Sequence, residues 1–133
     1  MLTALFVVGT SAACSNLSQR CNAIGGEPGV MVVIQRPWPS QTVTAQVCIA
    51  DTCRSAVSNG TQGSVFREGY LWVAHPALTS ERRVSATISL TGDAGKVLVA
   101  PVVRTLAPTK AQPNGPGCEP TFFVGTATVT PRP

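Results

Sequence analysis

Apolar and polar residues alternate strictly in the stretch Arg83-Val-Ser-Ala-Thr-Ile-Ser-Leu90. Successive side chains of a β-strand point to opposite faces, so every second residue from Val84 onward would share one apolar face. The turn residues Thr91-Gly-Asp-Ala-Gly95 follow, and an apolar run returns over 96–104. The pattern therefore predicts a β-hairpin that buries one of its faces.

Shorter runs of the same kind recur along the chain, with turn residues between them. Further strands are expected over 30–34, 42–49, 53–57, 70–74 and 122–130. Short strands with a turn roughly every 8–12 residues are typical of a sandwich. We predict an all-β fold, an immunoglobulin-like antiparallel β-sandwich of about seven strands, with a small barrel as the alternative. Residues 107–120 are expected to form an irregular loop. Pro101 cannot donate a ladder hydrogen bond, so we expect it at a sheet edge or a bulge.

A second hairpin is expected in Cys48-Ile-Ala-Asp-Thr-Cys53, around a tight turn at Ala50-Asp51. With a two-residue turn, the two cysteines form a cross-strand pair whose Cα atoms lie about 4.5 Å apart. That spacing suits a disulfide, which we predict here. A metal half-site is the rival interpretation, but such sites usually include nearby histidine, and His75 is the single histidine of the chain. We therefore expect no metal and no cofactor.

The opening residues are uncharged and mostly apolar, and they end in Ser11-Ala-Ala13 directly before Cys14. This stretch is too short to cross a bilayer, which needs about 20 helical residues, but it matches an export signal with a small-residue cleavage site. We predict lipid attachment at Cys14. The predicted segments are a signal over 1–13, a tether over 14–20 and one β-sandwich domain over 21–133. Cleavage after Ala13 without lipid, or a buried first strand in place of a signal, are the alternatives.

The chain has five cysteines, and an odd number needs an explanation in an exported protein. If Cys14 carries the lipid, Cys21 and Cys118 are left to pair with each other. In the chain-entropy treatment, closing a loop of about one hundred residues contributes about 4.7 kcal/mol, against about 2 kcal/mol for the short hairpin. Two disulfides place the domain in an oxidising, extracytoplasmic space, where the lipid would hold it on the cell membrane.

Composition narrows the functional classes. Apolar residues make up 44% of the chain and charged residues 12%, and the formal net charge is +4. The basic residues are scattered along the sequence, whereas a nucleic-acid-binding surface concentrates them on one face. We therefore expect no nucleic-acid partner. The expected partners are the membrane, through the lipid anchor, and an envelope polysaccharide or another envelope protein.

Catalytic candidates are few. His75 ends the run Trp72-Val-Ala-His75, and the sequence has no Gly-x-Ser-x-Gly elbow or partnered thiol to complement it. We interpret His75 as a strand-end residue that faces solvent or caps a turn. The protein is therefore predicted not to be an enzyme. A small hydrolase centred on His75 is the least favoured alternative.

The aromatic residues Trp38, Tyr70 and Trp72 are the candidates for a ligand platform, flat enough for a sugar ring or a peptide. Trp38 lies between two prolines in a loop, so we expect it to be exposed. Tyr70 and Trp72 share one strand face. Because large aromatic residues are mostly buried, we expect that face to be core rather than platform.

Three strings together resemble the small, uncharacterised exported lipoproteins of actinobacteria. These strings are Ser11-Ala-Ala-Cys14, Val47-Cys-Ile-Ala-Asp-Thr-Cys-Arg54 and Pro113-Asn-Gly-Pro-Gly-Cys-Glu-Pro120. The resemblance implies an extracytoplasmic location and an immunoglobulin-like domain more than it implies an activity. We expect a non-enzymatic, lipid-anchored envelope lipoprotein that acts as a binding or structural module. The alternative is a freely secreted binding domain of carbohydrate-binding or protease-inhibitor type.

Overall fold

The computed structural model describes residues 25–58 and 69–132. The predicted signal and tether, with Cys14 and Cys21, lie outside these ranges. The strands are β1 (Gly29–Ile34), β2 (Thr44–Ile49), β3 (Thr52–Val57), β4 (Tyr70–Ala74), β5 (Val84–Thr91), β6 (Val97–Leu106), β7 (Thr109–Ala111) and β8 (Phe122–Val129), with a 3-10 turn, η2 (Asp93–Gly95), between β5 and β6. Among the described residues, no helix has the length and hydrophobicity that a membrane span requires.

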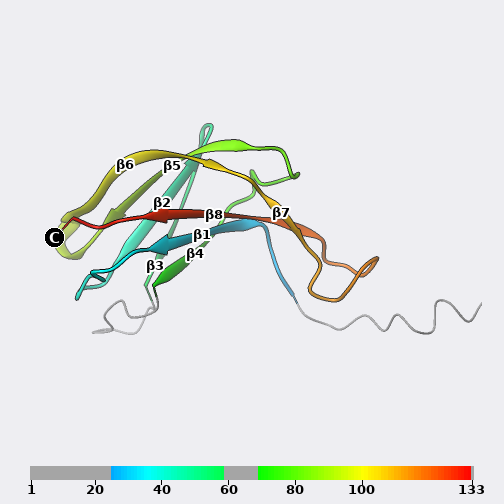
Figure 1. The fold of residues 1–133 in the computed structure, drawn as a ribbon, viewed down its shortest axis with the longest axis horizontal. Helices are drawn as coiled ribbons and strands as arrows, with labels where there is room; N and C mark the ends of the chain where they lie inside the picture. Colours follow the sequence, from blue (N-terminus) through cyan, green and yellow to red (C-terminus); the bar gives the residue numbers. More distant parts are fainter. Residues whose placement is uncertain (1–24, 59–68, 133) are drawn as a thin grey trace, which may run out of the picture.

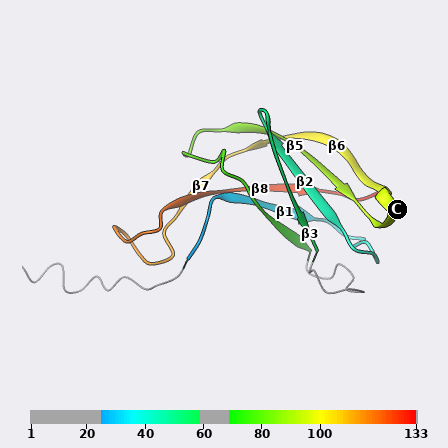
Figure 2. The same ribbon diagram turned by 180° about the vertical axis from the view of Figure 1, so that it is seen from behind.

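The strands form two four-stranded sheets that pack face to face. The first sheet has the order β4-β1-β8-β7 and the second sheet the order β3-β2-β5-β6. Figure 1 shows β1 and β8 in front of β2, and Figure 2, from behind, shows β2 and β3 crossing in front of β1 and β8. The predicted disulfide-stapled sandwich is confirmed in its architecture of two packed sheets. One pairing departs from the antiparallel prediction, because β1 and β8 run parallel, from Gly29↔Val124 to Ile34↔Val129.

The short strand β7 lies in the region that the sequence predicts to be an irregular loop. The chain leaves the second sheet after Leu106, and β7 then pairs with the beginning of β8, from Thr109↔Val124 to Ala111↔Phe122. Since β7 has three residues, it covers the outer edge of β8 as far as Val124. Beyond that point, no described strand pairs with this edge of β8.

Aliphatic side chains fill the space between the sheets. In β1 the alternation buries Val30, Val32 and Ile34, and in β5 it buries Ala86, Ile88 and Leu90. Two packed sheets lie about 10 Å apart, which is enough for interdigitated aliphatic side chains from both inner faces. No Phe, Tyr or Trp of the described ranges is fully buried in this core, and Phe123 packs against it from its margin.

Pro101 lies in an edge strand and also at a bulge, as predicted. β6 is the outermost strand of the second sheet. Its register with β5 shifts between Ile88↔Val102 and Leu90↔Val99, so Ala100 and Pro101 together lie opposite the single residue between them. A bulge leaves a residue outside the ladder, which removes the need for the N–H that proline lacks.

Gly29, the first residue of β1, allows the Trp72 ring to lie against the outer side of the first sheet. A Cβ atom at this position would lie 2.5 Å from Cζ2 of Trp72 and 2.7 Å from the carbonyl oxygen of Val73. No heavy-atom contact of a real Cβ is that short, so a side chain at Gly29 requires both the ring and β4 to move.

Replacing this glycine tests the close approach. We expect Gly29→Ala to lower the free energy of unfolding by about 1–3 kcal/mol, because the added methyl group overpacks the site. Gly25→Ala is the matched control, since nothing lies within 4 Å of a Cβ at Gly25. Thermal unfolding of both variants measures the effect, and equal melting temperatures would contradict the packing of Trp72 on β1.

Candidate functional site

The predicted disulfide joins Cys48 in β2 to Cys53 in β3. The hairpin has the predicted register: Cys48 pairs with Cys53 and Ile49 with Thr52, and the Cα atoms of the two cysteines lie 4.0 Å apart. Ala50 adopts a φ of +50° in the turn, which allows the chain to reverse within two residues. The bond therefore fastens the edge strand β3 to its neighbour on the outer face of the second sheet.

Cys118 is also disulfide-bonded and is 4% exposed. Its predicted partner Cys21 lies outside the described residues. The loop that carries Cys118 is ordered by its own hydrogen bonds: the Cys118 N–H donates to the carbonyl oxygen of Gly115 at 3.1 Å, and the Asn114 side chain donates to that of Glu119 at 2.7 Å. The cysteines of the β2–β3 hairpin and the cysteine of the loop before β8 are thus all oxidised.

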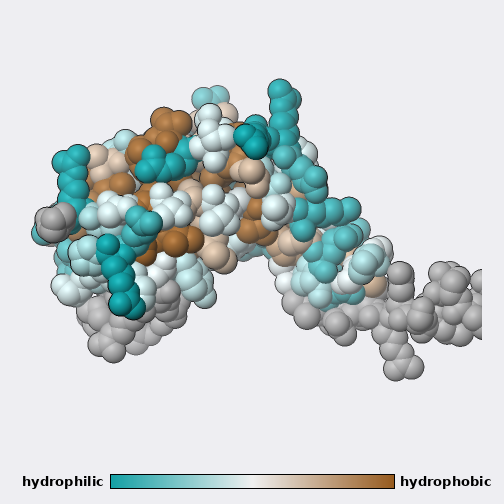
Figure 3. Space-filling model, viewed as in Figure 1, coloured by the Kyte–Doolittle hydropathy of each residue, from teal (hydrophilic) through white to brown (hydrophobic). Residues whose placement is uncertain are grey.

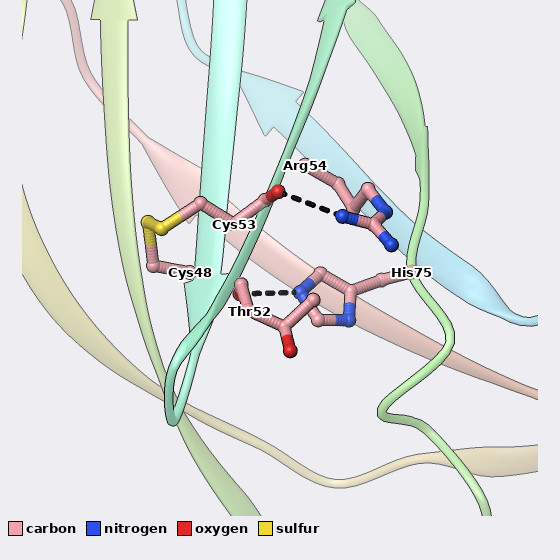
Figure 4. Close-up of a disulfide and its surroundings, with 5 residues drawn as sticks. All are labelled: Cys48, Thr52, Cys53, Arg54 and His75. Atoms are coloured by element: carbon pink, nitrogen blue, oxygen red, sulfur yellow. Dashed lines mark hydrogen bonds between the residues drawn. A yellow bond between two sulfur atoms is a disulfide. The ribbon is translucent and has the colours of Figure 1, made fainter.

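His75 follows β4 and is 1% exposed. Its Nδ1 accepts a hydrogen bond from the Ala77 N–H at 3.1 Å, and its Nε2 lies 3.0 Å from the carbonyl oxygen of Thr52 (Figure 4). A carbonyl can only accept, so Nε2 is the donor in this contact and Nδ1 is the acceptor in the other. The residue caps the turn after β4, as predicted, whereas the expectation that it faces solvent is wrong.

The hydrogen bond to Thr52 ties the two sheets together at one edge. Thr52 begins β3, the edge strand of the second sheet, and His75 follows β4, the edge strand of the first. Figure 4 shows His75 and Arg54 on one side of β3 and the disulfide on the other. Both nitrogens of the His75 ring are occupied by backbone groups, which gives this side chain a structural role.

Substitution of His75 tests that role. We expect His75→Ala to lower the free energy of unfolding by about 2–4 kcal/mol, because it leaves a cavity and orphans the Ala77 N–H and the Thr52 carbonyl. His75→Asn is expected to lose less, since asparagine can accept from the N–H two residues on but cannot reach Thr52. Urea unfolding monitored by fluorescence measures both. Equal stability of the wild type and His75→Ala would contradict a stabilising contact between the two sheets at His75.

The three aromatic residues of the candidate platform gather at one edge of the first sheet. Val73 and Leu71 point inward from β4, so Tyr70 and Trp72 point outward. The expectation that this face is core is wrong: Tyr70 is 44% exposed and Trp72 is half-buried. The loop residue Trp38 is 38% exposed, as predicted.

Trp38 is held in place by contacts on several sides. Its indole N–H donates to the carbonyl oxygen of Ile34 at 2.9 Å, and the Arg36 guanidinium lies over the ring, 4.5 Å from the centroid. Gly69, with a φ of +77°, passes so close that a Cβ there would lie 2.9 Å from Cζ2 of Trp38. Because Gly69 directly precedes Tyr70, this contact places Trp38 beside the end of β4.

The outer face of the first sheet combines rings, aliphatic groups and hydroxyls. By register and alternation, the outward residues are Tyr70, Trp72 and Ala74 in β4, Gly29, Met31 and Val33 in β1, Phe122, Val124, Thr126 and Thr128 in β8, and Thr109 and Ala111 in β7. Figure 3 shows hydrophobic patches among polar residues along β1 and β8. None of these outward residues carries a charge. We call this surface the aromatic face.

No protein-family model, curated protein or solved structure matches the chain. Within residues 25–58 and 69–132, no group of three or more His, Cys, Asp or Glu side chains is placed to hold a metal ion. The case for a function therefore rests on the fold and on the surfaces described above.

Proposed function

We propose that this protein is a non-enzymatic binding module of the bacterial cell envelope, anchored to the membrane by lipid on Cys14. Its aromatic face would bind an envelope polysaccharide. The observation that supports this proposal most is the outward placement of Tyr70 and Trp72 on an edge strand, beside the exposed Trp38, while the fully buried residues of the described core cluster are all aliphatic.

The chemistry of the aromatic face suits a neutral sugar polymer. Sugar rings present apolar C–H faces, which pack on aromatic rings, and hydroxyl groups, which hydrogen-bond to side chains such as Thr126 and Thr128. An exposed apolar surface rimmed by polar residues commonly marks an interaction site. A strongly charged ligand would find no opposite charge among the outward residues of these four strands.

The anchor is supported by the Ser11-Ala-Ala-Cys14 string and by the oxidised cysteines of the domain. Cys48, Cys53 and Cys118 are all disulfide-bonded, as befits an exported protein. An odd fifth cysteine at the end of a signal segment is then accounted for by lipid. A freely secreted domain, cleaved after Ala13, would keep the same aromatic face.

Lipid attachment can be tested by metabolic labelling with an alkyne fatty acid in a bacterial host with lipoprotein-processing enzymes. We expect wild-type protein to be labelled and Cys14→Ala to be unlabelled, because only the Cys14 thiol follows the small-residue site. Cys118→Ala is the control for the loss of a cysteine elsewhere, and it is expected to keep the label. Equal labelling of wild type and Cys14→Ala would reject the anchor.

Polysaccharide binding can be tested by affinity electrophoresis in gels that contain purified cell-wall polysaccharide. We expect Trp72→Ala and Tyr70→Ala to weaken binding at least about tenfold, which is typical of central aromatic contacts. Val103→Ala is the control, since Val103 is 63% exposed but lies in the second sheet. Unaltered retardation of both aromatic variants, with unchanged melting temperatures, would exclude the aromatic face as the binding site.

A further inference from the structure

A cleft of about 320 Å³ opens between β6 and the segment that follows β8. Its wall includes residues 99–102, the bulged part of β6, together with Arg104, Thr130 and Arg132. This volume lies at the lower end of the range for small-molecule sites, about 300–1,000 Å³. The aromatic face does not contribute to it, so the cleft is a separate feature of the molecule.

The fold leaves this space open for two reasons. β7 ends its pairing with β8 at Val124, so the later part of β8 has no described strand on the edge that faces away from β1. The bulge at Ala100 and Pro101 also interrupts the ladder between β5 and β6. The cleft is therefore a consequence of strand length and register, and most of the residues that line it belong to β6.

Arg104 is fixed in the cleft by two backbone groups. Its Nε donates to the carbonyl oxygen of Thr128 at 3.3 Å and its Nη1 to that of Val103 at 3.2 Å. A guanidinium has five N–H groups, so these two bonds leave three for a ligand. Arg104 thus spans from β6 to the open edge of β8 and keeps donors available.

Arg132 reaches the same cleft from the end of the described chain. Its backbone N–H donates to the carbonyl oxygen of Leu98 at 3.1 Å, which ties the segment after β8 to β6. The Thr130 hydroxyl donates to Oε1 of Gln35, so Thr130 forms part of the wall and does not donate to a ligand. The charged donors in the cleft are therefore the two guanidinium groups.

No acidic residue lines the cleft within the part of the chain that the structure describes. Two cations that share a partly enclosed space repel each other unless an anion lies between them. Arginine pairs bidentately with phosphate oxygens. A phosphate group is tetrahedral, so two guanidinium groups can approach its oxygens from different directions, whereas a carboxylate holds both of its oxygens in one plane.

We propose that this cleft binds a phosphate group, whose oxygens accept hydrogen bonds from Arg104 and Arg132. In a bacterial envelope, such a group is available from a lipid headgroup and from a soluble or polymeric phosphodiester. The cleft lies at the end of the sandwich where β1 and β8 finish. The site does not depend on the polysaccharide-binding function proposed for the aromatic face.

The proposal is tested by isothermal titration calorimetry of the full mature protein with inorganic phosphate and with glycerol 1-phosphate at low ionic strength. We expect saturable binding with one site per chain. Arg132→Gln should weaken it at least about tenfold, since each charge-assisted contact contributes about that factor. The Arg132 side chain makes no hydrogen bond to the described residues, so this variant is expected to fold normally.

Arg54→Gln is the matched control because it removes the same charge from the opposite edge of the sandwich. Arg54 is exposed on β3, where its Nη1 donates to the carbonyl oxygen of Cys53 at 3.2 Å. This variant should bind phosphate like the wild type. Equal losses in Arg54→Gln and Arg132→Gln would show an unspecific charge effect and overturn the proposal, as would the absence of saturable binding to every probe.

Vesicles distinguish the two sources of phosphate. Co-sedimentation of the unlipidated Cys14→Ala protein with phosphatidylglycerol vesicles, compared with phosphatidylcholine vesicles, measures headgroup binding. Binding that Arg132→Gln abolishes would assign the phosphate to a lipid, and binding of glycerol 1-phosphate without vesicle binding would assign it to a soluble or polymeric ligand. Both results support a phosphate site. The Trp72→Ala assay is independent, so the failure of either proposal leaves the other open to its own test.

Discussion

The narrow space between two packed sheets is the constraint on which the rest of this structure depends. Period-two alternation directs Val30, Val47 and Ile88 into that space, where all three are 0% exposed. Aliphatic side chains of this size fill the gap from both sides, and the large rings of Tyr70 and Trp72 remain outside. A surface rich in aromatic groups is thus the complement of a core built from valine, isoleucine, leucine and alanine.

Sheet edges supply the remaining chemistry of the molecule. An edge strand exposes unpaired backbone groups, and proteins protect such edges with bulges, inward charges or covering segments. At one edge, the Cys48–Cys53 disulfide and the His75 hydrogen bond fasten β3. At the other, the bulge at Pro101 and the hydrogen bond from Arg104 to Thr128 occupy the gap between β6 and β8. The contacts at the first edge close it, whereas those at the second edge leave a cleft lined by arginine side chains.

Features set by neighbouring residues could be predicted from the sequence, and those set by distant ones could not. The Cys48–Cys53 register follows from the two-residue turn between the strands. The position of Pro101 follows from the backbone N–H that proline lacks. The orientation of β4 does not, because Leu71 and Val73 on one face and the aromatic residues on the other are all residue types that a core can hold. The partner of His75 lies 23 residues away, at Thr52. The parallel pairing of β1 with β8 and the change of sheet before β7 likewise depend on contacts between residues that are far apart in the sequence.

The aromatic face and the cationic cleft lie on the same β-sandwich, and their separation bears on how they can cooperate. Strands in a sheet are spaced by about 4.8 Å, so the four strands of the first sheet span about 15 Å between the outermost backbones. A single sugar or phosphate can engage one surface at a time, and the two binding free energies are then independent. A polymer that carries both sugar rings and phosphodiesters and exceeds this span can occupy both. In that case the first contact would raise the effective concentration for the second, so the two proposed sites on one domain would retain the polymer more strongly than either site alone.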